Sequence, residues 1–390
     1  MTYNIKLMAE EMQEEIVSLR RQLHKIAELS FCEFKTSEFI KNYLSDLGLL
    51  VKTDVYKTGV VGFLDLGKEN TLLIRADMDA LPILEENNLE YKSENKGVMH
   101  ACGHDAHMAV VLSSAKLLVK IKDALSVNVL FVFQPGEETE GGADPMIKTG
   151  LLEEFSVKGA VGLHVMNDVP VGKILLKNGA LMASPDDFDL YIHGKGGHGA
   201  YPEKCLNPIY VASEVIHSLE KLISSVSMPD SYVVFSVCSV NAGSAYNIIP
   251  DTVHVRGTAR SFSDETRKRI SLMMEEEIKK VCSSFGASFD FKFNLRYPPL
   301  INDEKCVELM AKTVSDIYGA ESIVWAKEPS MAGEDFSYFA KEVPSVYFYL
   351  GSENKEKGAV APLHSPEFII DEDCLKIGVS AIVSYAVNFS

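Results

Sequence analysis

The sequence lacks the features that mark several classes of protein. Its 390 residues carry 55 acidic against 38 basic side chains, and the net charge of −17 leaves no basic tract for binding nucleic acid. No apolar run approaches the ~18 residues of a membrane span, and the acidic N-terminus has no apolar core of a signal peptide. The seven cysteines, an odd number without a C-x-x-C pair, argue against a disulfide framework. We therefore expect a cytoplasmic protein that binds neither nucleic acid nor membranes.

Sequence signatures of covalent catalysis and of nucleotide binding are also absent or weak. There is no G-x-S-x-G, no S-x-x-K and no Walker A loop. One G-x-G-x-x-G begins at Gly194, but a dinucleotide site needs a helix that opens directly from the glycines. Here YPEKCLNP stands before the next predicted helix. We interpret these glycines as a tight turn around His198.

The first half of the chain predicts an α/β domain with a mostly parallel sheet. Apolar runs at 72–76, 128–134 and 159–164 are typical of buried strands. Periodic segments between them predict helices at 105–124 and around 145–154. Strand and helix therefore alternate, which indicates parallel strands flanked by helices. Two further helices are predicted at 10–26 and 36–47.

The order of predicted elements changes near residue 187. The pattern becomes strand, helix, strand, strand, helix, strand, which is typical of a ferredoxin-like α+β domain. The alternation of helix and strand resumes after Pro298 and Pro299. We expect a catalytic domain at 1–183 and 297–390, interrupted by a satellite domain at 184–296. The predicted elements of the second half are strands 188–193, 232–240, 252–261, 288–295, 322–325 and 345–350, and helices 208–225, 263–285, 303–318 and 372–388.

Side chains that can bind metal follow the strands of the predicted parallel sheet. In such sheets, sites form beyond the carboxyl ends of the strands. Here the first strand ends at Asp77-Met78-Asp79, the second enters Pro135-Gly136-Glu137-Glu138, and the third ends at His164. The segment HACGHDAH stands just before the long helix. A single histidine or an acidic turn carries little weight, but convergence from separate segments is what a metal site requires.

This predicted site has a ligand set for transition metals. A cysteine thiolate, imidazoles and a carboxylate suit Zn²⁺, Ni²⁺, Co²⁺ or Mn²⁺ better than Mg²⁺ or Ca²⁺. The side chains are Cys102, His104, His164 and Glu138. Neighbouring carboxylates point in different directions, so one of the Glu137-Glu138 pair can bind metal while the other acts as a base. A base beside a metal-activated water is the usual requirement for hydrolysis.

Seven motifs together resemble the M20 metallopeptidases, and the cysteine-containing version resembles the amidohydrolase branch, its subfamily D. The resemblance runs from about residue 19 to the last helix, with the motifs in the family's order. It implies the same fold, with an inserted lid or dimerisation domain. The motifs are RADMDALP (75–82), HACGHDAH (100–107), QPGEE (134–138), GLHV (162–165), GKGGH (194–198), AGEDFS (332–337) and LHSP (363–366).

The resemblance implies a role for each site residue. Two divalent transition-metal ions (Zn, Mn, Ni or Co) would be bound, with His364 as an added ligand and the cysteine bridging the two metals. Glu137 would be the general base, and Asp79 would orient a ligand histidine. Asp77 receives no metal role. The implied metal ligands are Cys102, His104, Glu138, His164 and His364.

In the satellite domain, the resemblance implies substrate contacts. His198 would stabilise the oxyanion, in relatives within the partner subunit's site, which implies a homodimer through this domain. Asn247 would be a companion polar contact, and Arg260 would bind the substrate's α-carboxylate.

The resemblance implies hydrolysis of N-acyl-L-amino acids, hippurate-like or N-acetylated, by an aminoacylase or hippurate hydrolase type of enzyme. The alternatives are an N-acetyl-diaminopimelate deacetylase, a small dipeptidase, and a metal-free binding module of the same fold.

Overall fold

The computed structural model describes residues 3–225 and 232–390 and divides them into two units. The first unit takes in residues up to Leu181 together with Ile301–Glu328 and Asp335–Ser390, and the second contains Met182–Leu300 and Pro329–Glu334. Among the helices of the described residues, none has the length and apolarity needed to cross a bilayer. That the chain divides into separate domains after residues 183 and 296 stays a prediction.

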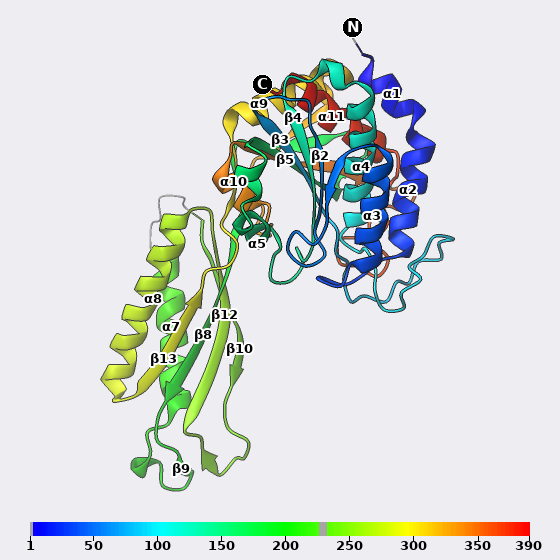
Figure 1. Ribbon diagram of the computed structural model, residues 1–390. Coiled ribbons are helices and arrows are strands. Elements are labelled where there is room, and N and C mark those ends of the chain that lie inside the picture. The colour runs from blue at the N-terminus through cyan, green and yellow to red at the C-terminus, as the bar shows by residue number, and fades with distance from the viewer. Residues whose placement is uncertain (1–2, 226–231) are drawn as a thin grey trace. The chain divides into compact units, whose positions relative to one another are not determined.

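The first unit is built on an eight-stranded sheet with the order β1-β2-β4-β3-β5-β16-β6-β15. Figure 1 labels β2, β3, β4 and β5 of this sheet. Strand β3 (Thr71–Asp77) pairs in parallel with both β4 (Asn128–Gln134) and β5 (Val157–Pro170). Every residue of β3 and β4 is buried, as expected for central strands covered on both faces. The other strands are β1 (Leu50–Lys52), β2 (Val60–Leu64), β6 (Ile174–Leu176), β15 (Ile323–Trp325) and β16 (Ser345–Glu353).

Helix α4 (His104–Lys120) is the central helix of the first unit. It contacts α2, α11 and strand β3, and its apolar side chains belong to the unit's hydrophobic core. The predicted mixed α/β class with a parallel-rich sheet is thereby confirmed. The remaining elements of this unit are α1 (Ile5–Glu11), α2 (Gln13–Lys25), α3 (Phe34–Asp46), η1 (Lys122–Ala124), α5 (Ala143–Lys148), α6 (Leu151–Glu154), α9 (Glu304–Tyr318), η3 (Ala320–Ser322), α10 (Ser337–Glu342) and α11 (Cys374–Asn388).

Several predicted elements of the first unit are corrected in their bounds. The helix predicted at 10–26 is two helices that meet at Met12. The Met12 N–H donates to the Ala9 carbonyl three residues back, a tighter hydrogen bond than in an α-helix and one that is common at helix ends. The helical segment predicted around 145–154 is likewise divided, at Gly150, which has a left-handed φ of 87°. Strands β1 and β2, which run antiparallel to each other, were not predicted.

The second unit has a four-stranded antiparallel sheet with the order β10-β12-β8-β13. Helices α7 (Pro208–Ser225) and α8 (Asp264–Phe285) pack on it and share its hydrophobic core. Helix α8 begins where the Ser263 side chain accepts from the Thr266 N–H, and it ends at the left-handed Gly286. The predicted strand–helix–strand–strand–helix–strand order is confirmed. The strands are β8 (Ser184–His193), β9 (Gly197–His198), β10 (Val234–Asn241), β11 (Ile248–Ile249), β12 (Thr252–Ser261) and β13 (Ser288–Asn294); β7 (Gly179–Met182) and β14 (Leu300–Asn302) lie where the chain passes between units. A short 3-10 helix, η2, spans Pro202–Lys204.

Candidate metal centre

The register of the central strands brings their metal-capable side chains to one edge of the sheet. Asp77 at the end of β3 lies opposite Gln134 of β4. On the other side of β3, Arg75 lies opposite Gly162 of β5, so His164 stands level with Asp77. The turn that carries Glu137 follows β4 directly. The parallel strands therefore deliver Asp, Glu and His to the same place.

The HACGHDAH segment reaches this edge because the backbone turns sharply at Gly103. This residue has a left-handed φ of 86°, and a Cβ there would lie 2.3 Å from the Val165 side chain. Only glycine accommodates both the conformation and the close approach. The turn places Cys102 before helix α4 and His104 in its first position.

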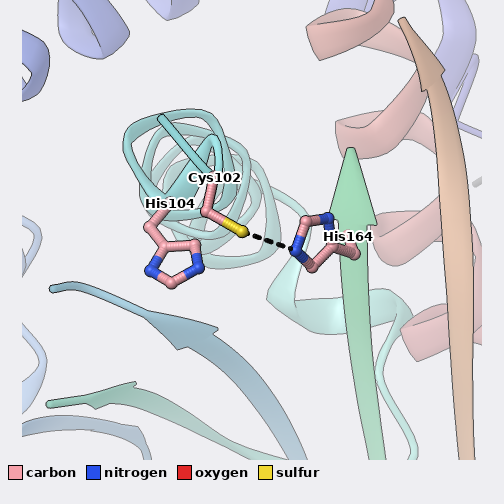
Figure 2. Close-up of side chains that lie close together, drawn as sticks. All are labelled: Cys102, His104 and His164. Atoms are coloured by element: carbon pink, nitrogen blue, oxygen red, sulfur yellow. Dashed lines mark hydrogen bonds between the residues drawn. The ribbon is translucent and has the colours of Figure 1, made fainter. Parts of the chain in front are cut away.

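The structure brings all five predicted metal ligands together. The ligand atoms of Cys102, His104 and His164 lie within 4.8 Å of one another, as do those of Cys102, Glu138 and His364. The Cys102 Sγ lies 3.3 Å from His164 Nε2. Figure 2 shows this sulfur, just before α4, turned towards the His164 ring on β5. The cysteine thus belongs to two groups of possible ligands.

The two buried histidines use Nδ1 for hydrogen bonds to the backbone, which leaves Nε2 of each ring for a metal. His104 Nδ1 donates to the Asp79 carbonyl at 2.9 Å, and His164 Nδ1 donates to the Val165 carbonyl at 2.7 Å. Each ring, when neutral, therefore presents Nε2 as an acceptor that a metal could bind. His104 Nε2 and Glu138 Oε1 are both buried and lie 3.7 Å apart, too far for a hydrogen bond between them. Such facing acceptors and the N, S and O donor set fit a transition-metal ion.

The electrostatics of this cluster also fit a cation. Burial, with Glu138 and Glu137 nearby, holds the pKa of Cys102 well above its usual value. Burial alone would lower the pKa of His104, but Asp77 and the other carboxylates raise it to about 10. Without a cation, these carboxylates therefore favour a protonated His104 and a neutral Cys102 thiol, whereas a bound cation would favour the neutral imidazole and the thiolate.

His364 reaches the cluster in a strained backbone conformation. Its φ is 64°, which is uncommon for a residue other than glycine, and its N–H donates to the Ala101 carbonyl at 2.9 Å. Its Nε2 lies 3.4 Å from Glu138 Oε1, and this contact is the main cause of a raised pKa. Strained residues of this kind concentrate at functional sites.

The Asp79 carboxylate holds the turn that carries the two glutamates. Its Oδ1 accepts the Glu137 N–H at 3.2 Å, and its Oδ2 accepts the Glu138 N–H at 3.1 Å. The hydrogen bond to the His104 ring is made by the Asp79 carbonyl, while the carboxylate lies 3.4 Å away. Asp79 therefore contacts both the histidine and the acidic turn, whereas only contact with the histidine was predicted.

Sequence reasoning assigned no role to His107, although it lies one helical turn from His104 and that spacing could have signalled it. His107 Nδ1 donates to Asp77 Oδ1 at 2.7 Å, and its Nε2 accepts the Val165 N–H at 2.9 Å. Both ring nitrogens are therefore engaged, so this ring is no metal ligand. It links the end of β3 to the backbone beside His164.

The charge of Asp77 is balanced by a second buried network. Arg75 donates to Asp77 Oδ2 at 2.7 Å and to Asp335 Oδ1 at 2.8 Å. Asp335 Oδ2 in turn accepts from the Gln134 amide at 2.7 Å. Asp77 thus lies in a hydrogen-bonded network, consistent with the absence of a metal role in the sequence analysis.

The residues predicted to bind substrate lie in the second unit. His198 on β9 pairs with Ile248 on β11, and Gly199 donates to the Asn247 carbonyl at 2.8 Å, so His198 and Asn247 are neighbours. Arg260 is half-buried and lies near the other end of the four-stranded sheet. It pairs with Pro185 at the start of β8, whereas Thr252, which follows β11, pairs with His193 at the end of β8. Within this unit the structure brings His198 and Asn247 together but not Arg260.

Buried imidazoles, a cysteine and adjacent carboxylates at the strand ends of an α/β sheet define the site of a metal-dependent hydrolase. The peptidase family M20/M25/M40 matches residues 73–388. The chain belongs to this family and to its amidohydrolase branch, and it is an enzyme that acts on amides or peptides.

Relatives and solved structures agree with this assignment. The chain is 38% identical to thermostable carboxypeptidase 1 of Saccharolobus solfataricus, over 97% of this chain and 96% of that protein. It is 36% identical to N-acetyl-L-cysteine deacetylase of Bacillus subtilis, over 93% of this chain and 85% of that protein. It is similar to the solved YXEP protein of Bacillus subtilis, a dinuclear metal-binding peptidase of the M20 family. That match has a TM-score of 0.85 and 31% identity, and it covers 97% of this chain and 98% of that one.

Proposed function

We propose that this enzyme hydrolyses the amide bond of N-acyl-L-amino acids, hippurate-like or N-acetylated, to a carboxylic acid and a free amino acid. The observation that carries the proposal is the sharing of ligands. Cys102 and Glu138 each belong to more than one of the possible ligand groups. That arrangement suits a pair of ions, and the similarity to a deacetylase of an N-acetyl amino acid supports the substrate class.

The proposed cofactors are two divalent transition-metal ions (Zn, Mn, Ni or Co). Bound ions of this kind polarise a carbonyl and lower the pKa of a water molecule. The residues that would hold them are Cys102, His104, Glu138, His164 and His364. All five are present, which argues against the alternative of a metal-free binding module.

In this proposal Glu137 moves the protons. Its side chain follows Gly136 at the end of β4, within 4.8 Å of ligand atoms of His104 and Glu138. A carboxylate at that position can take the proton of the attacking water and then deliver it to the leaving amine. Asp79 keeps the carboxylate in place through the Glu137 N–H.

The second unit would bind the substrate. His198 would donate to the oxyanion, with Asn247 beside it, and Arg260 would pair with the α-carboxylate. His198 lies in the two-stranded sheet that follows the end of β8 and precedes β12, whereas Arg260 lies near the opposite ends of these two strands. This separation supports a homodimer in which His198 serves the partner's site.

The test is to mix subunits carrying Glu137→Gln with subunits carrying His198→Ala. Activity returns on mixing if the proposal holds, and stays absent if both residues act within one chain.

The proposed reaction is tested with Glu137→Gln on N-acetyl and N-benzoyl amino acids. We expect activity to be lost while bound metal, measured by elemental analysis, is retained. Full activity with metal retained would refute the assignment of the base. The cytoplasmic location remains part of the proposal, supported by seven cysteines that are all free.

Peptide hydrolysis is a second candidate, because the chain is also similar to a carboxypeptidase. A carboxypeptidase or a small dipeptidase would use the same site and the same base. The predicted alternative of an N-acetyl-diaminopimelate deacetylase needs a further cation for the second carboxylate. Values of kcat/KM for N-acyl amino acids, dipeptides and N-acetyl-diaminopimelate, measured on one preparation, decide among them.

A further inference from the structure

Three successive backbone N–H groups of the acidic turn are each held by a buried carboxylate. Those of Glu137 and Glu138 are bound by Asp79, as described above. The N–H of Gly136 donates instead to Glu33 Oε1 at 3.1 Å. Glu33 is 0% exposed and comes from a distant part of the sequence. The turn is therefore held on a second side by a group outside every recognised motif.

The other oxygen of Glu33 is also engaged. The Thr58 hydroxyl donates to Oε2 at 2.5 Å, and Thr58 is itself buried. Glu33 stands at the N-cap position of helix α3, yet its side chain makes no capping hydrogen bond. The carboxylate thus joins the segment before β2 to the acidic turn.

The neighbours of Glu33 contact the same place. The Phe31 ring lies against Gly136, where a Cβ would come within 2.2 Å of its edge. Phe31 and Gly136 both have left-handed φ values, 63° and 71°. The Ser30 hydroxyl donates to Asp79 Oδ2 at 2.6 Å. Three side chains of residues 30–33, which we call the brace loop, therefore meet the acidic turn or the aspartate that holds it.

We propose that Glu33 is a positioning residue, which through the Gly136 N–H fixes the turn so that Glu138 reaches the metal ligands and Glu137 faces them. This inference rests on the proposed function, which gives those two glutamates their roles. The brace acts through hydrogen bonding. Losing an outer partner of this kind typically costs about 10- to 100-fold in metal affinity or activity.

The hydrogen-bonding pattern predicts which substitutions are tolerated. A glutamine amide can accept the Gly136 N–H and donate to the Thr58 hydroxyl, because a hydroxyl rotates to accept as readily as to donate. A leucine fills a similar volume but leaves the Gly136 N–H without an acceptor. Glu33→Gln should therefore rescue what Glu33→Leu loses.

Glu28 offers a matched control in the same part of the chain. Its Oε2 accepts the Thr36 N–H at 3.0 Å and the Thr36 hydroxyl at 3.1 Å, at the start of helix α3. These hydrogen bonds stabilise the helix and leave the acidic turn untouched. Glu28→Leu should lower thermal stability without changing metal affinity.

The experiment titrates each metal-free variant with Co²⁺ by calorimetry and visible absorption, and measures kcat and KM on N-acetyl amino acids. For Glu33→Leu we expect Co²⁺ affinity and kcat to fall about 10- to 100-fold with KM little changed. For Glu33→Gln we expect both within a few-fold of the parent protein. Equal losses in Glu33→Gln and Glu33→Leu, or in Glu28→Leu, or no loss in Glu33→Leu, would overturn the proposal.

Two further variants keep the test decisive. If Glu33→Leu does not fold, Thr58→Val removes the other hydrogen bond of the carboxylate, and unchanged Co²⁺ affinity and kcat there would count against the brace.

Glu137→Gln separates the two proposals. If Glu137→Gln stays active, the proposed function fails while the Co²⁺ titrations still judge the brace. If it is inactive and Glu33→Leu matches the parent protein, only the brace fails.

Discussion

The two sheets of the protein place their polar side chains differently. In the first unit, β3 and β4 are buried along their whole length, and their polar groups at the strand ends are joined in networks such as Arg75–Asp77–His107. In the second unit, β8 alternates between buried and partly exposed residues, and polar side chains such as His254 lie on the open face. The first arrangement engages buried polar groups with one another, whereas the second leaves polar side chains partly exposed. Substitutions in the two units should therefore fail in different ways.

The largest expected difference compares two buried cysteines. Cys102 in the first unit is 6% exposed and Cys282 in the second is 1% exposed. Cys102→Ser should lower metal affinity and kcat/KM by more than the ~100-fold of losing an outer partner, because it removes a proposed ligand. Cys282→Ser should lower only thermal stability. Calorimetric metal titration and thermal melts of both variants check this, and equal metal affinity would break the comparison.

The second prediction concerns the pH dependence of the buried brace. Burial raises the pKa of Glu33 from 4.5 to about 7. A carboxyl whose folded pKa is raised binds its proton more tightly when folded, so its contribution to stability is present below pH 4.5 and is lost as pH rises towards 7. The metal-free parent should therefore lose on the order of 3 kcal/mol relative to Glu33→Gln across that window. Denaturant unfolding of both proteins at pH 4.5, 6 and 7.5 measures it, and parallel curves would contradict it.

A third prediction compares the same substitution in the two units. His107→Leu removes both hydrogen bonds of a fully buried ring, so we expect Co²⁺ affinity to fall about 10- to 100-fold. His254→Leu removes a partly exposed pair with Asp189, whose loss should cost about 0–1 kcal/mol of stability and leave Co²⁺ affinity unchanged. Titration and thermal melts of the two variants test the contrast. Similar metal affinities would show that the Asp77–His107 link does not support the site.

The parts of this contrast that could be predicted are those that leave a local sequence pattern. The central strands are mostly apolar and are followed by metal-capable side chains, so the approach of Glu138 and His164 to one edge followed from the parallel order. His364 could be placed only by resemblance, because a lone histidine in a left-handed conformation has no periodic signal. Strand β2 escaped prediction because the preceding turn uses left-handed Tyr56 and Lys57, which sequence does not mark as turn residues. The hydrogen bond of Glu33 to Gly136 joins residues remote in sequence, and such contacts leave no spacing pattern.

The smallest expected effect sharpens the comparison from the second unit. Arg260 is half-buried, and burial lowers the pKa of its guanidinium while Asp186 opposes that shift. If it binds the substrate's α-carboxylate through two parallel hydrogen bonds, Arg260→Lys retains the charge but loses the fork. We expect KM to rise about 10-fold, since one charge-assisted hydrogen bond contributes about 1.5–3 kcal/mol, with kcat and Co²⁺ affinity unchanged. Steady-state kinetics on an N-acyl amino acid, and on the same compound with its α-carboxylate converted to an amide, distinguish the cause. For the compound without the carboxylate, KM should differ little between the parent protein and Arg260→Lys. A fall in metal affinity would mean that the second unit also supports the metal centre. The assignment of metal binding to the first unit and substrate binding to the second would then be wrong.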